Sequence, residues 1–235
     1  FDFYAHTGWG EVSPMLAVCK LCAGTGTPEP SSRRSRLVFT DGYVIHRLCG
    51  APVISRNLAA MSGLYSLVGS DWWDPALRCA DVTASELPGI LDIGEPGGRL
   101  SPELARRWGM QRVPVVAGAN DQTAAALGAG LASPGDVNLG LGTAYVAYKV
   151  VEPNSSAPPS RPLRGAYVGG LNYQLTLHNT AGGVMEWTRD VFADDADWEE
   201  FFDAALSAQP GAGGLRVAPG FSGQGGGRLD GLSLH

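Results

Sequence analysis

Charged residues are scarce in this sequence, and they do not gather into a basic patch. Of the 235 residues 17% are charged, and 23 acidic side chains against 17 Lys and Arg give a formal net charge of -6. No run of Lys or Arg is longer than two residues. Proteins that bind nucleic acid or an anionic membrane surface usually concentrate positive charge on one face. We therefore expect no nucleic-acid or membrane partner, and a small molecule or another protein instead.

Long hydrophobic runs are also missing. No stretch approaches the roughly 20 consecutive apolar residues that a membrane-spanning helix needs. Residues 1–30 lack the ordered basic, apolar and cleavage regions of a signal peptide, so we expect the cytoplasm. The sequence starts at Phe1 without an initiator Met, and it ends at His235 just as a new element would begin. We expect an internal piece of a longer protein.

Cysteine is rare, with four residues in the whole chain. So few thiols do not make a disulfide scaffold and agree with a reducing compartment. Cys19 and Cys22 form a C-x-x-C, which is half of a four-ligand zinc site, but no second C-x-x-C or H-x-x-x-H completes it. The alternative is that both thiols lie on a helix as small apolar residues. Cys49 and Cys79 are isolated in the sequence.

Glycine, in contrast, is abundant, with 33 residues, as expected for an α/β nucleotide-binding protein with many tight turns. The first hundred residues are predicted to be mostly helical, with apolar-periodic segments at 14–23, 37–48 and 73–79. Ser101 and Pro102 are typical of a helix start, and Gly109 of its end.

The rest of the chain alternates between strand and helix patterns. A short apolar run at 113–118 predicts a buried strand, followed by a turn and a helix over 123–131. The later predictions are strands at 136–141, 143–151 and 173–177, helices at 182–192 and 198–206, a loop at 152–162, and no regular structure at 210–228.

The best candidate for chemistry is Asp121, within the run GANDQTAAALGAG at 118–130. It lies between the predicted strand and helix, where open α/β sheets collect their ligands. The helix dipole favours the ionised form of a carboxylate there, as a general base requires. The alternative is that Asp121 only caps the helix, the commonest role of Asp before a helix.

Several motifs resemble the FGGY family of carbohydrate kinases when taken in order. The run VPVVAGANDQ at 113–122 is similar to the family's segment with the catalytic Asp. The other matching segments are TDGYVIHRLCG at 40–50, SGLY at 62–65, WD at 73–74, LP at 87–88, GGRLS at 97–101, LGT at 141–143 and AGGVMEW at 181–187. No single motif is decisive, but their order over nearly the whole chain is.

This resemblance implies an α/β fold of the actin-like ATPase (ribonuclease H-like) type, with two incomplete domains. Residues 1–132 would hold the sugar side and Asp121, and residues 133–235 the nucleotide side. The implied activity is ATP-dependent phosphorylation of a sugar or polyol, such as the ketopentose xylulose, with Mg supplied as the nucleotide complex. The resemblance also allows a homodimer.

The resemblance assigns roles to particular residues. Asp121 would be the general base, and Gln122 would hydrogen-bond another sugar hydroxyl, unless it is simply an exposed helical residue. Gly142 and Thr143 would approach a phosphate, unless they only form a hairpin. Gly182 and Glu186, at a helix start, would contact the nucleotide, the alternative being a glycine turn packed against a neighbour.

Some segments depart from the family pattern. Where most members have T-D-x-S-N-A-S-R-T-G, residues 54–63 have ISRNLAAMSG, so the usual Asp, second Asn and Arg become Ser55, Leu58 and Met61. The expected G-E-R-x-P loop is replaced by GFSGQGGGR at 220–228.

The family's D-x-G-T phosphate loop and Gly-rich adenosine loop do not occur in the sequence. We therefore expect little or no kinase activity from the 235-residue chain alone. The alternatives are a non-catalytic pseudokinase or sugar-binding relative, and an unrelated Gly-rich α/β binding protein.

Overall fold

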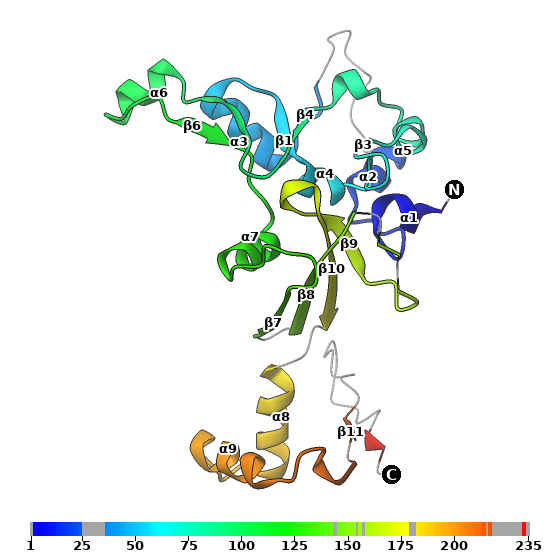
Figure 1. The fold of residues 1–235 in the computed structure, drawn as a ribbon, viewed down its shortest axis with the longest axis vertical. Helices are drawn as coiled ribbons and strands as arrows, with labels where there is room; N and C mark the ends of the chain where they lie inside the picture. The colour runs from blue at the N-terminus through cyan, green and yellow to red at the C-terminus, as the bar shows by residue number, and fades with distance from the viewer. Residues whose placement is uncertain are drawn as a thin grey trace. The chain divides into compact units, whose positions relative to one another are not determined.

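Figure 1 shows the computed structural model of the chain. It describes residues 2–24, 36–142, 145–153, 155–156, 158–178, 182–214, 216–217 and 232–233. The chain divides into two compact units, which are treated separately below. The first consists of Phe1–Val137 and Tyr148–Leu175, and the second of Asn138–Ala147 and Thr176–His235.

The helices of the first unit largely follow the predictions. They are α1 (Phe3–Thr7), α2 (Ala17–Cys22), α3 (Thr40–Cys49), α4 (Arg56–Ala60), α5 (Asp74–Cys79), α6 (Pro102–Arg107) and α7 (Asp121–Gly128), with the 3-10 turns η1 (Ala84–Glu86) and η2 (Val168–Gly170). At α6 the Ser101 hydroxyl accepts the Leu104 N–H, and Pro102 is the first helical residue, as predicted. The helices predicted at 14–23, 37–48 and 73–79 are confirmed as α2, α3 and α5.

The prediction that the first hundred residues are mostly helical is wrong, because short strands run between the helices. They are β1 (Val53–Ser55), β2 (Tyr65–Ser66), β3 (Asp71–Trp72), β4 (Gly89–Leu91) and β5 (Pro96–Arg99). β1 pairs with β4 in parallel, and β2 with β3 antiparallel. Segments of two to four residues are too short to show the alternation by which a strand is recognised in a sequence.

The strand predicted at 113–118 exists as β6 (Pro114–Val116), but it is not buried. β6 pairs antiparallel with β5 in a two-stranded sheet, and the Val116 side chain is 48% exposed. Ala117, just past the strand, is the buried residue. The prediction of burial was wrong because an apolar run shows strand propensity without showing how many neighbours cover the strand.

A four-stranded sheet has the strand order β7-β8-β10-β9. Its strands are β7 (Val137–Leu141), β8 (Tyr145–Val151), β9 (Leu163–Ala166) and β10 (Asn172–His178), which confirms the strands predicted at 136–141, 143–151 and 173–177. β9 and β10 are antiparallel. The division between the two units crosses β7, β8 and β10. Gly165 is required in β9, because a Cβ there would overlap the Tyr173 ring.

The first unit buries its apolar side chains in separate clusters. One gathers around Leu64, Trp73 and Leu77 and lies between α2 and α5. Another gathers around Ile54 and Tyr65, which come from β1 and β2, and includes Ala166 from the end of β9. The second cluster also includes Ala59 and Ala60 of α4, so this helix is fixed by core packing.

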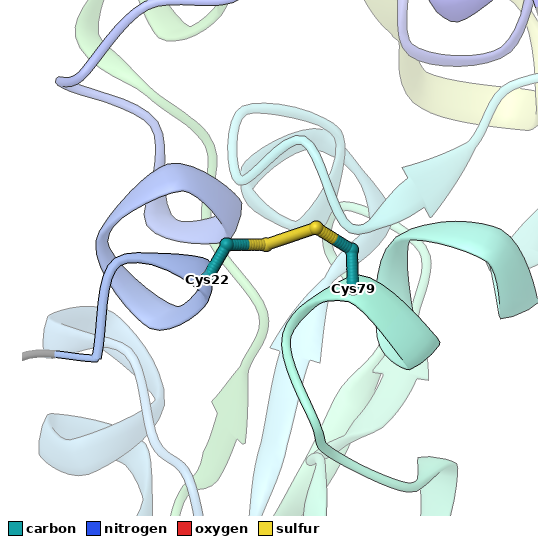
Figure 2. The surroundings of a disulfide bond; sticks show 2 residues. All are labelled: Cys22 and Cys79. Atoms are coloured by element: carbon teal, nitrogen blue, oxygen red, sulfur yellow. A yellow bond between two sulfur atoms is a disulfide. The ribbon is translucent and has the colours of Figure 1, made fainter.

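A disulfide joins Cys22 at the end of α2 to Cys79 at the end of α5 (Figure 2). The interpretation of Cys22 as a small apolar thiol is therefore wrong, and Cys79, isolated in the sequence, is paired in the fold. A separation of 57 residues in the sequence hides a pair whose Cα atoms lie 5.7 Å apart in the fold. Cys19 and Cys49 are free thiols. Among the described residues no group of three or more His, Cys, Asp or Glu forms a metal site, so the C-x-x-C has no partners for zinc there.

The second unit contains α8 (Gly182–Phe192) and α9 (Trp198–Ser207), the turn η3 (Ala212–Gly214), and the pair β11 (Arg216–Val217) and β12 (Leu232–Ser233). Both predicted helices are confirmed. Asp197 and Glu200 form a capping box at the start of α9. Most of the Gly-rich run at 210–228 lies outside the described residues. In the part of the chain that the structure describes, no helix is long and apolar enough to span a membrane.

Candidate functional site

Asp121 is the first residue of α7 and is exposed to solvent. One of its carboxylate oxygens accepts the backbone N–H of Gln122 at 2.8 Å. Gln122 is also exposed. The turn between β6 and α7 therefore exposes a carboxylate and an amide at consecutive positions on the surface of the first unit.

The cap of α7 is Asn120, and not Asp121. The Asn120 side-chain oxygen accepts the Thr123 N–H at 2.8 Å, the bond that defines an N-cap. The alternative interpretation of Asp121 as the cap is therefore wrong. Asn and Asp are equally good caps, so the sequence alone could not decide which of two neighbours takes the position.

A buried amide holds this turn from below. Asn57, in α4, is fully buried, and its side-chain oxygen accepts the backbone N–H of Asn120 at 2.9 Å. Its side-chain nitrogen donates to the Thr123 hydroxyl at 3.0 Å and to the Ala166 carbonyl at 2.8 Å. The side-chain nitrogen of Asn120 in turn donates to the Met61 sulfur at 3.0 Å. The turn that carries Asp121 is thus bonded to α4.

Tyrosine side chains extend the network. The Tyr148 phenol shares a hydrogen bond of 2.8 Å with the Thr123 hydroxyl, and its ring stacks on Tyr173 with centroids 4.7 Å apart. Burial raises the pKa of the Tyr173 phenol to about 12, opposed by a hydrogen bond with the Asn120 side chain. Burial also raises the pKa of Tyr148 above its ordinary value of 10. Both phenols therefore stay neutral at physiological pH and act as hydrogen-bonding partners.

The second unit brings two of the predicted nucleotide residues together. The Gly182 N–H, at the start of α8, donates to the Gly142 carbonyl at 2.9 Å, across 40 residues of sequence. Glu186 is exposed one turn further along α8. Thr143 lies outside the described residues. The Gly182 N–H is occupied by Gly142 and is not free to bind a phosphate in this arrangement.

The fold and these motifs have counterparts among known proteins. Residues 13–128 match the model of the "FGGY family of carbohydrate kinases, N-terminal domain". The chain belongs to the FGGY family of carbohydrate kinases. This family match contains α7 and Asp121, together with the Asn57 segment that holds the turn.

Individual FGGY kinases match over different lengths. The chain is 32% identical to xylulose kinase of Escherichia coli over 57% of its own length and 28% of that enzyme. It is 25% identical to gluconokinase of Bacillus subtilis over 95% of its length and 46% of that enzyme. The crystal structure of xylulose kinase from Rhodospirillum rubrum superposes with a TM-score of 0.80 at 27% identity, covering 99% of this chain and 49% of that one.

These matches confirm the actin-like α/β fold that the motifs predicted. The chain spans about half the length of that solved structure and less than half of the two curated relatives.

The residues that hold the site were not predicted from the sequence. Asn120 and Asp121 are both good caps, so the local pattern marked the position only to within these two neighbours. Asn57, Thr123 and Tyr148 carried no such signal, since their partners lie far away in the sequence.

Proposed function

We propose that the reading frame containing this chain encodes an ATP-dependent sugar kinase in which Asp121 is the general base. The observation that carries the proposal is the division of roles at the start of α7. Asn120 caps the helix, which leaves the exposed Asp121 carboxylate without a structural task beyond its bond to the next amide. A carboxylate held at a rigid turn and open to solvent is suited to accept a proton from a bound hydroxyl.

The chemistry assigned to these residues is phosphoryl transfer. The sugar hydroxyl oxygen bonds to the γ-phosphorus of ATP, the bridging oxygen leaves with ADP, and the hydroxyl proton passes to the Asp121 carboxylate. Gln122, exposed next to it, would bond a neighbouring hydroxyl and orient the sugar. Mg would enter as the complex with ATP, since the phosphates and waters supply most of the ligands of this ion in kinase sites.

The nucleotide would be held by the second part of the chain. We assign residues 1–132 to the sugar domain and 133–235 to the nucleotide domain, with Gly142, Thr143, Gly182 and Glu186 near the phosphates. The bond between Gly182 and Gly142 supports a shared location for these residues. Nucleotide binding would require that bond to open, or the neighbouring N–H groups of α8 to take the phosphate.

The proposed substrate is a ketopentose, with xylulose first. Two similar proteins named above are xylulose kinases, and the match to gluconokinase makes a sugar acid the leading rival. Both classes present the adjacent hydroxyls that a carboxylate with a neighbouring amide would bind. Several classes of sugar must therefore be tested as substrates.

The test is ATP turnover by the longest reading frame that contains the chain, against ketopentoses, polyols and aldonates. Asp121→Asn should lower kcat by about 10²- to 10⁴-fold, because it removes the proton acceptor and keeps the shape. Glu103→Gln is the matched control, since Glu103 is also an exposed carboxylate in the first turn of a helix. If Asp121→Asn and Glu103→Gln have the same activity, Asp121 is not the base.

The second candidate function is sugar binding without catalysis. It is favoured by the segment around α4, where the altered family positions serve the fold. Ser55 caps α4 by accepting the Leu58 N–H, and Met61 contacts Asn120. Titration calorimetry of the wild-type protein with each sugar of the panel tests this function. A sugar that binds without any ATP turnover would identify it.

A further inference from the structure

We infer that Asn57 is a positioning residue, whose side-chain amide fixes the turn that carries Asp121. The inference rests on the proposed function, in which Asp121 is the base. Asn57 does not touch a ligand bound at the surface, because the residue is 0% exposed. Its effect on chemistry would pass through the backbone on either side of Asp121.

Asn57 places hydrogen bonds on both flanks of Asp121. On one side its oxygen accepts the backbone N–H of Asn120, the residue directly before the base. On the other side its nitrogen donates to the hydroxyl of Thr123, two residues after the base. A single planar amide therefore spans the first turn of α7, and Asp121 lies between its two points of attachment.

The amide is itself held in one orientation. The Asn57 nitrogen also donates to the Ala166 carbonyl, so both of its N–H groups have acceptors. A flipped amide would place its oxygen against that carbonyl and its N–H groups against the Asn120 N–H. Only the observed orientation satisfies all three partners, so rotation of the side chain is opposed at each contact.

The partners of Asn57 are anchored in turn. The Thr123 hydroxyl bonds the buried Tyr148 phenol at 2.8 Å. The Tyr148 ring in turn stacks on the ring of Tyr173, with centroids 4.7 Å apart. The turn is thus tied to α4 and to the adjacent strands β8 and β10. A displacement of about 1 Å in a catalytic group can cost on the order of 10²-fold in rate, which is why such support would matter to kcat.

A merely structural role is the competing explanation, and Asn172 is the matched control for it. Asn172 is also a buried asparagine, 1% exposed, and its side-chain nitrogen donates to the Pro153 carbonyl at 3.1 Å. It lies in β10 next to Tyr173, and neighbouring residues of a strand point to opposite faces. Its loss should weaken the fold without disturbing the first turn of α7.

The experiment compares Asn57→Ala with Asn172→Ala in the longest reading frame that contains the chain, well below the melting temperature of each. We expect Asn57→Ala to lower kcat by about 10- to 100-fold. Its KM values for sugar and ATP should change less than threefold, because Asn57 does not contribute to uniform binding of either substrate. Asn172→Ala should keep kcat within about twofold. Equal kcat values for the two variants would overturn the inference.

A double mutant separates this inference from the proposed function. If Asn57 acts through Asp121, adding Asn57→Ala to Asp121→Asn should lower kcat little further, because the effects are not additive. Full kcat in Asp121→Asn alone would remove the proposed function. Low kcat in Asp121→Asn with normal kcat in Asn57→Ala would remove only the role of Asn57.

Hydrogen exchange gives a measure that needs no activity. The amide hydrogens of Asn120 and Thr123 should exchange faster in Asn57→Ala than in the wild type, since the Asn120 N–H loses its acceptor. In Asn172→Ala they should exchange at the wild-type rate. Unchanged protection of residues 120–123 in Asn57→Ala would contradict the inference whether or not the protein is a kinase.

Discussion

The Tyr167 phenol donates a hydrogen bond to the Leu131 backbone carbonyl at 2.8 Å, 36 residues away in the sequence. Leu131 lies just beyond the end of α7, and Tyr167 just beyond the end of β9. α7 is therefore held at both ends, by Asn57 at the start and by Tyr167 beyond the last turn. This double attachment explains why so short a helix can present Asp121 at a defined place.

Tyr167→Phe should destabilise the first unit without abolishing any activity. The substitution keeps the ring but leaves the buried Leu131 carbonyl without its partner, which costs about 1–3 kcal/mol. Urea unfolding followed by tryptophan fluorescence measures the difference. Tyr43→Phe is the control, because the Tyr43 side chain is 51% exposed, and its stability should match the wild type. Equal stability of the two variants would show that the bond contributes nothing.

The disulfide should stabilise the oxidised chain. Closing a loop between residues 57 positions apart lowers the entropy of the unfolded chain and is worth about 4 kcal/mol in the chain-entropy model. Cys79→Ser should therefore lower the melting temperature in the absence of reductant, and dithiothreitol should lower that of the wild type to the same value.

Cys49→Ser is the matched control for this disulfide, because Cys49 is a free thiol. Alkylation of the unfolded, unreduced wild type should label Cys19 and Cys49 and leave Cys22 and Cys79 unlabelled. Labelling of all four cysteines in protein purified without reductant would mean that the pair is reduced in the cell, as the few cysteines led us to expect.

Asp136 should make the fold sensitive to acid. Its carboxylate accepts the backbone N–H groups of Ala132 and Ser133, each at 2.9 Å, and these bonds lower the pKa of Asp136 below its ordinary value of 3.8. A carboxylate with a lowered folded-state pKa stabilises the fold above its unfolded pKa. That contribution is lost as the pH falls through the folded pKa.

The measurement is the free energy of unfolding as a function of pH, for the wild type and Asp136→Asn. The two curves should be separated near neutral pH and should converge as the pH falls below about 4, because the wild type then loses the same interaction. Curves that stay parallel over this range would show that Asp136 does not contribute in this way.

The sequence by itself determined the features that depend on neighbours along the chain. Ser101 and Pro102 defined the start of α6 through local capping and a fixed backbone angle. The apolar period of residues 182–192 predicted α8 at its observed bounds. The ordered motifs were also sufficient to identify the family and its fold.

The tertiary structure alone decided which of these residues meet. Asn57 and Asn120 are 63 residues apart, and Cys22 and Cys79 are 57 apart, so no local pattern could pair them. The choice of Asn120 over Asp121 as the cap also needed the fold, because the two are equal in intrinsic preference. The buried Asn57 amide bonds the Asn120 backbone, and Asn120 then caps α7 and leaves Asp121 exposed. Local propensity placed Asp121 at a helix start, and long-range packing made its carboxylate available.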